Sequence, residues 1–342
     1  MMYKRMFVVG LLIFLMSVSA FSQDEAEFSL EDLQTVADNF SKSLAQALPF
    51  NSTMGLNWAD AYIGQILGKP PRFGIGISIG TTLIPVIGMD DLFSIFGVNL
   101  SLDKLKIGIP LPGYTVEARI GGIVLPFDLG IKFGYVPTMK IPFGLDIGVK
   151  NIIIGADIRY SLLPRTIKIV KLSIGFGYNY LNGGITKALE LGRSFDFGNE
   201  DTGIYNLNIK DPTLSIDWKT HCFELKAQAS FSFKIVTPYA GVGVSYAKSQ
   251  AGYRIATDVS VTKDGSPVDI DKAQEIINDL PGLQTININE KGFESIQGIN
   301  NWNFRAFGGL SFNIKKARID LTLMYNFLSK SLGGTLGVRF QM

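Results

Sequence analysis

The chain has few of the residues that most often carry out catalysis or crosslink an exported protein. Its 342 residues include one cysteine, Cys222, and one histidine, His221. A single cysteine cannot form an intrachain disulfide, and one cysteine with one histidine makes no metal site. Neighbours on a strand point to opposite faces, so these two side chains cannot converge as a catalytic pair. We therefore expect a protein that is not an enzyme and has no metal and no cofactor.

The chain also has few charges and no apolar run of about 18 residues. Charged residues make up 18% of the sequence, and the net charge of +2 indicates no nucleic-acid partner. The apolar stretch at residues 6–16 is too short to span a bilayer as a helix. It follows two basic residues and precedes Val18 and Ala20, which fit the small-residue rule for cleavage. Residues 1–20 are therefore predicted to be a signal peptide for export through the Sec pathway.

The dominant pattern in the sequence is an alternation of apolar and polar residues. In FELKAQASFSF, residues 223–233, phenylalanine, leucine and alanine occupy one face, and glutamate, lysine, glutamine and serine occupy the other. A period of two predicts a strand with one apolar and one polar face. The same alternation predicts strands within residues 72–81, 114–122, 127–135, 154–162, 172–180, 238–247, 302–312, 317–327 and 336–342.

Short and long links alternate between these strands, and the long ones are 82–113, 137–151, 181–220 and 248–301. Outer-membrane barrels have this asymmetry, with short periplasmic turns and long external loops. Together with a mean hydropathy of +0.23 and aromatic strand ends, it predicts an all-β fold, a transmembrane antiparallel β-barrel over residues 71–342. We expect an even number of strands, about 10 to 14, because weak alternation also occurs at 96–102 and 213–218. A soluble β-sandwich is the alternative.

Residues 21–70 lack this alternation and show helical spacing instead. Ser29 and Asp32 resemble a helix N-cap, and an apolar stripe follows them. We expect an amphipathic helix of about 20 residues and interpret the region as a small helical N-terminal hatch or plug. The barrel lumen, the periplasmic mouth and a partner are the candidates for the surface that buries the stripe. The stripe consists of Leu30, Leu33, Ala37, Phe40, Leu44 and Leu48.

The chain thus combines a signal peptide, a helical hatch, the run GLNWADAYIG, the strand PPRFGIGISIG and an aromatic residue near the C-terminus, Phe340. This layout resembles the FadL-like family of outer-membrane transporters, and particularly the FadL-like proteins of spirochaetes. The resemblance implies transport of long-chain fatty acids or other hydrophobic compounds. Asn57, Trp58 and Ala59 stand where better-known members carry Asn-Pro-Ala, so the plugging contacts of the family are not carried over.

Inward-facing positions of the predicted barrel carry a nearly balanced set of charges. Many lie two residues apart on one strand, as Glu117 with Arg119 and Asp157 with Arg159 do. We expect these charges to form a salt-bridged interior wall rather than a charge-selective pore. The predicted lumen network comprises Glu117, Arg119, Asp128, Lys132, Asp157, Arg159, Glu224, Lys226, Arg305, Arg318, Asp320 and Arg339.

Two large apolar residues, Phe307 and Met324, share the inward parity of these charges. With the hatch aromatics Phe50, Trp58 and Tyr62 they are the candidate ligand-binding residues of an apolar pocket. The alternative interpretation is that they pack on the N-terminal helix.

A barrel of this size exceeds the roughly eight strands whose interior is filled by side chains and is smaller than an open porin. The sequence therefore predicts an outer-membrane channel for passive, gated uptake of long-chain fatty acids or similar hydrophobic small molecules. Expected partners are outer-membrane lipid, the hydrophobic ligand and, during insertion, the barrel-assembly machinery. The alternatives are a general diffusion porin for polar solutes and an adhesin-like barrel that acts through its external loops. The largest of these loops, 248–301, contains a predicted helix at 271–280.

Overall fold

A computed structural model describes residues 30–68, 70–84, 109–140, 147–164, 166–167, 169–188, 193–199, 203–209, 213–256, 259–263, 266–268 and 293–342. The predicted signal peptide, the weak alternation at 96–102 and the predicted helix at 271–280 lie outside the described residues.

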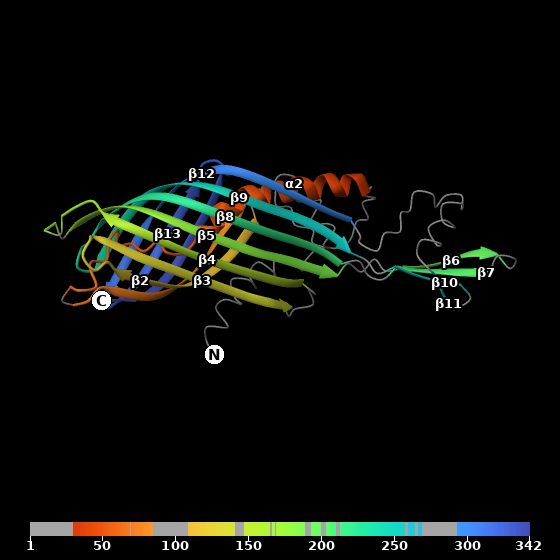
Figure 1. Cartoon of the computed structure of the whole chain (residues 1–342), viewed down its shortest axis with the longest axis horizontal. Coiled ribbons are helices and arrows are strands. Elements are labelled where there is room, and N and C mark those ends of the chain that lie inside the picture. Colours follow the sequence, from red (N-terminus) through yellow and green to blue (C-terminus); the bar gives the residue numbers. More distant parts are fainter. Residues whose placement is uncertain are drawn as a thin grey trace.

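Within the described residues, ten strands form a closed antiparallel barrel, which confirms the predicted fold class (Figure 1). Their order is β1-β14-β13-β12-β9-β8-β5-β4-β3-β2. β1 closes the barrel, since Ile77 lies opposite Val338 of β14 and Val116 of β2. The strands are β1 (Phe73–Ile84), β2 (Ile109–Gly121), β3 (Phe127–Lys140), β4 (Ile147–Ser161), β5 (Val170–Ala188), β8 (Thr213–Phe231), β9 (Val236–Ala256), β12 (Phe293–Ile314), β13 (Ala317–Asn326) and β14 (Ser331–Gln341).

The helix α2 (Leu30–Ser52) precedes the barrel, and a second sheet lies beyond one end of it (Figure 1). We call this end the long-link end, because β5 leads there into β6 and β9 leads there into β10. The opposite end, where β2 turns into β3 and β8 turns into β9, is the short-turn end. Among the described residues, no helix combines the length and the apolarity needed to cross a membrane. The second sheet has the order β11-β10-β7-β6 and consists of β6 (Arg193–Asn199), β7 (Gly203–Ile209), β10 (Val259–Lys263) and β11 (Ser266–Val268).

The barrel is taller on one side than on the other. β9 and β12 have 21 and 22 residues, whereas β13 and β14 have 10 and 11. The tall strands extend far into the regions 181–220 and 248–301, which were predicted to be links. β2 and β4 likewise begin inside the predicted links 82–113 and 137–151. The links at the long-link end are therefore shorter than predicted.

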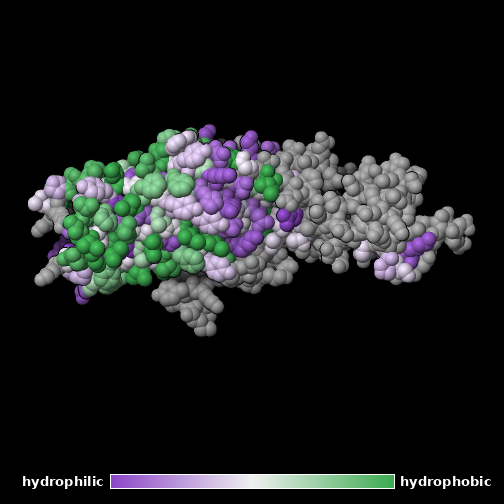
Figure 2. Space-filling model, in the orientation of Figure 1, coloured by the Kyte–Doolittle hydropathy of each residue, from purple (hydrophilic) through white to green (hydrophobic). Residues whose placement is uncertain are grey.

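The polarity of the two faces reverses along the tall strands. Toward the short-turn end the outward face is apolar and the inward face polar, and toward the long-link end the outward face is polar and the inward face apolar. On β8, the outward positions change from the apolar Leu225 to the charged Lys219, while the inward positions change from Glu224 to the buried Trp218. Figure 2 shows hydrophobic surface concentrated toward the short-turn end and hydrophilic surface nearer the long-link end. Because of this reversal, a single apolar face covers only part of each tall strand.

Candidate functional site: the filled lumen

The chain that precedes β1 fills the lumen. Every residue from 47 to 63 is buried, and we call this stretch the inner segment. Its start lies near the long-link end, where Leu44 and Trp218 share one apolar cluster. Past its end, Ile66 N donates to Gly122 O at the short-turn end (3.1 Å). The chain therefore passes through the barrel from the long-link end, where Figure 1 shows α2, to the short-turn end.

The last turns of α2 have one face toward the barrel wall and one toward solvent. Leu44 and Leu48 are buried, whereas Asn39, Lys42 and Gln46 are exposed. α2 packs along β8, β9 and β12, so the wall of the tall side buries this part of the predicted stripe. The side chains of the remaining stripe residues lie outside the described set: Leu30, Leu33, Ala37 and Phe40.

Glu117 of β2 holds the middle of the inner segment. Its Oε2 accepts hydrogen bonds from Leu56 N (2.9 Å) and from Trp58 Nε1 (2.6 Å). The chain bends here through the left-handed region, with φ of 80° at Gly55 and 56° at Leu56. A Cβ on Gly55 would lie 2.6 Å from Thr115 Oγ1. Glycine is therefore favoured at position 55 both by conformation and by space.

Other wall residues satisfy the backbone of this irregular segment, whose buried N–H and C=O groups require partners. Lys132 Nζ donates to Ser52 O (2.7 Å) and Met54 O (2.5 Å), and Gln228 Nε2 donates to Trp58 O (2.7 Å). Further bonds of this kind join Ala61 N to Ser230 Oγ, Ile63 N to Asp128 Oδ2 and Arg159 Nη1 to Asp60 O.

Asp60 anchors the inner segment near the short-turn end. Its Oδ1 accepts a hydrogen bond from Lys171 Nζ (3.1 Å), and its Oδ2 accepts from Arg339 Nη2 (3.2 Å) and Gln341 Nε2 (3.1 Å). The Asp60 carboxylate therefore ties the segment to β5 and β14. Asp60 is not among the predicted site residues, although it is the one acidic residue of the run GLNWADAYIG.

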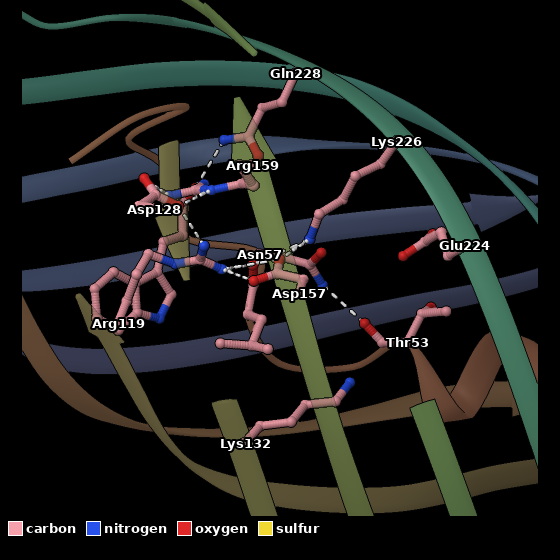
Figure 3. Close-up of polar contacts among 12 residues, drawn as sticks. Thr53, Asn57, Arg119, Asp128, Lys132, Asp157, Arg159, Glu224, Lys226 and Gln228 are labelled. Carbon is pink, nitrogen blue, oxygen red and sulfur yellow. Dashed lines mark hydrogen bonds and ion pairs between the residues drawn. The ribbon is translucent and has the colours of Figure 1, made fainter. Parts of the chain in front are cut away.

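The predicted lumen charges come together, but they pair across strands (Figure 3). Arg119 contacts Asp128 at 2.5 Å and Asp157 at 2.7 Å. The prediction that residues two apart on one strand pair with each other is thereby corrected. The partners lie on neighbouring strands, as Arg159 and Asp128 do, or on strands separated by one other strand, as Arg119 and Asp157 do. Other pairs are Arg159 with Asp128, Lys226 with Asp157, Arg305 with Glu224 and Arg339 with Asp320.

An inward glycine makes room for the contact between Arg119 and Asp157. Gly130 of β3 lies between Arg119 of β2 and Asp157 of β4 in the register of the sheet. A Cβ at this position would lie 2.5 Å from Asp157 Oδ1 and 2.6 Å from Arg119 Nη2. The arginine therefore reaches across a whole strand because the strand between carries no side chain there.

The candidate ligand residues lie in two places. Phe307, Met324 and Phe50 share one buried apolar cluster, completed by Met54, Ala59 and Tyr239. Trp58 lies apart from them, with its ring 4.7 Å from the Arg339 guanidinium, and Tyr62 is buried in the inner segment. Phe307 and Met324 thus pack against Phe50, which belongs to the N-terminal helix α2, as in the alternative interpretation.

The wall between β2 and β3 is incompletely hydrogen-bonded. In the described residues of both strands, the ladder runs from Gly121 opposite Asp128 to Val116 opposite Phe133 and ends there. Both strands continue toward the long-link end. We call the unpaired part, residues 109–115 and 134–140, the seam.

Side chains bond to backbone groups at the seam, and one of these bonds crosses it, from Tyr135 N to the Tyr114 hydroxyl (3.0 Å). Pro110 and Pro112 of β2 have no N–H to donate. Asn51 Nδ2, from the inner segment, donates to Leu111 O (3.0 Å) and to Thr82 Oγ1 of β1 (2.8 Å). The inner segment is therefore bonded directly to the seam.

No protein-family model matches the sequence, and no curated protein matches it. Solved structures with a similar chain course include Ail, the attachment invasion locus protein of Yersinia pestis, at 11% identity and a TM-score of 0.27 over 79% of this chain and 98% of that one. A KdgM porin has 9% identity and a TM-score of 0.29 over 79% and 99%. The translocator domain of the autotransporter NalP from Neisseria meningitidis has 9% identity and a TM-score of 0.29 over 91% and 98%. Similarity at this level carries no information about activity.

Proposed function

We propose that this protein is an outer-membrane channel for passive, gated uptake of long-chain fatty acids or similar hydrophobic small molecules. The observation that carries the proposal is the bond between the inner segment and the seam, made by Asn51. A movement of the inner segment would clear the lumen and free the backbone of β2 that borders the seam. These contacts support a gating role for the segment.

An outer-membrane location is supported by the apolar belt on the outside of the barrel. Large side chains such as Ile131, Leu225 and Leu323 are 62%, 63% and 69% exposed. A contiguous apolar surface of this kind around a barrel requires lipid or a partner to cover it. By the usual asymmetry of such barrels, the short turns are periplasmic and the long-link end is external.

The interior near the long-link end suits an apolar ligand better than a polar one. Inward residues there include Ile153, Leu181 and Ile216, all buried in the cluster around α2. An apolar molecule entering from outside would meet this cluster first and could leave through the seam into the bilayer. Such movement runs down a gradient and needs no energy source.

The proposal is tested by the binding of a fluorescent long-chain fatty acid to the purified barrel. The double variant Phe307→Asp with Met324→Asp should weaken binding at least about tenfold, because tenfold is only about 1.4 kcal/mol and a carboxylate in an apolar site costs more. The control is Ser260→Asp with Ser266→Asp, which adds the same charges at exposed positions of the second sheet and should leave binding unchanged.

Equal binding by the lumen variant and the control would contradict the proposal. Free passage of sugars in a liposome-swelling assay, without fatty-acid binding, would favour a general diffusion porin. A surface-interaction barrel is the second candidate, and the observation in its favour is the second sheet built from the external links.

A further inference from the structure

A cluster of basic and aromatic side chains lies on the outside of the barrel where the strand faces reverse polarity. His221 of β8 is opposite Tyr180 of β5 and Lys248 of β9. Lys219 lies two residues before His221, on the same face of β8. Tyr178 completes the group, which we call the basic rim. The rim spans three adjacent strands and faces away from the lumen.

Contacts within the basic rim order its side chains. The Tyr178 hydroxyl and His221 Nδ1 are 2.7 Å apart, and the Tyr180 and His221 rings are 5.0 Å apart. Lys219 Nζ lies 5.9 Å from the centre of the Tyr180 ring. When Tyr178 donates to Nδ1, the imidazole carries its hydrogen on Nε2, which remains as a donor beside the two lysines.

The part of the chain that the structure describes offers the cations of the basic rim no neutralising carboxylate. Asp217, the acidic residue on the same face of β8, pairs with Lys150 at 2.8 Å. Among the described residues, no carboxylate lies within ion-pairing distance of Lys219 or Lys248. The rim therefore presents positive charge that these residues do not compensate.

The rim lies where the outer surface of the barrel changes from apolar to polar. On the short-turn side of it the outward residues are apolar or aromatic, as Phe176 and Phe223 are, with stacked rings 6.4 Å apart. On the long-link side the outward residues are polar, as Gln250 is. Aromatic residues followed by lysines mark the boundary between hydrocarbon and water.

We propose that the basic rim binds the phosphate group of an anionic lipid in the leaflet at the long-link end. Lysine ammonium groups and an imidazole N–H are donors that suit phosphate oxygens, and the tyrosine rings suit the adjoining glycerol or sugar and upper acyl chain. The external leaflet supplies this lipid if the long-link end is external. The inference does not depend on the proposed uptake function.

The test uses the purified full-length barrel in nanodiscs of phosphatidylcholine with an equal amount of phosphatidylglycerol, and native mass spectrometry counts the retained lipids. Wild type should retain phosphatidylglycerol preferentially, and Lys219→Gln with Lys248→Gln should reduce that preference about tenfold. The single variant His221→Phe should reduce it by a smaller factor. The control, Lys234→Gln with Lys316→Gln, removes the same charge at exposed positions of the short-turn end and should leave the preference unchanged.

Heat-modifiable migration shows that each variant is folded before lipids are counted. Equal retention of both lipids by the wild type would overturn the inference. So would an equal loss in the rim variant and the control, because general charge rather than the rim would then account for the preference.

Discussion

Removal of residues 30–63 should convert a closed barrel into an open channel. In planar bilayers, conductance should rise about tenfold or more, because a ten-stranded barrel without the inner segment has an unfilled polar lumen. The deleted barrel should remain heat-modifiable, since its ten strands form a closed ladder without α2. An unchanged conductance in a folded barrel would show that the inner segment does not close the lumen.

A single substitution should reproduce part of this opening. Asp60→Ala removes the hydrogen bonds that Lys171 and Arg339 make to the inner segment, while Arg339 keeps its pair with Asp320. The loss of hydrogen bonds to a charged group costs about 1.5 to 3 kcal/mol. The matched control is Asp217→Ala, which removes the carboxylate of a half-exposed pair with Lys150, where the cost is about 0 to 1 kcal/mol. In planar-bilayer recordings, brief openings of the channel should appear with Asp60→Ala and not with Asp217→Ala.

An arginine on the outer face should oppose membrane insertion. Leu225→Arg, at a position 63% exposed within the apolar belt, should destabilise the folded barrel by about 2 to 4 kcal/mol if it lies at the middle of the bilayer. Gln250→Arg, on the polar part of the outer face, should cost about 0 to 1 kcal/mol. Urea unfolding in lipid vesicles measures the free energy of unfolding of both variants. An equal loss of stability in the two would contradict a lipid-facing belt.

Alternation alone supports the expectation that an arginine at Ser230, on the inward face, extends into a water-filled lumen and is tolerated. The structure contradicts this expectation. Ser230 faces inward as predicted, but it is fully buried and its Oγ accepts a hydrogen bond from Ala61 N. An arginine at this position would displace the inner segment rather than extend into water. Alternation identifies which face a residue occupies, and it does not show what lies against that face.

Sequence periodicity was sufficient for the barrel because one property, an apolar side chain, recurs at the outward positions of the belt. All ten predicted strands lie in the barrel. It was insufficient near the long-link end, where α2 makes inward residues such as Trp218 apolar and solvent makes outward residues such as Lys219 polar. At this end the apolar face points inward and the polar face points outward, so the strand continues beyond the stretch in which the outward face is apolar.

The charge network was predictable as a set of residues and not as a set of partners. The inward parity of Arg119 and Asp157 follows from the alternation, but their contact depends on Gly130 of the strand between them. The register of three strands decides that contact, and register is not visible in one strand's pattern. The roles of Asp60 and Asn51 depend on where an irregular segment docks, which no periodicity specifies.

The passage of the chain through the lumen is tested most directly by labelling intact cells with a membrane-impermeant maleimide, in a Cys222→Ser background. Asn39→Cys, on the exposed face of α2, should be labelled from outside, as should Leu328→Cys in the β13–β14 turn. Lys316→Cys, in the turn at the short-turn end, should be labelled only after permeabilisation. If Asn39→Cys instead behaves like Lys316→Cys, α2 does not lie at the external mouth, and the account of a lumen filled from the long-link end to the short-turn end is wrong.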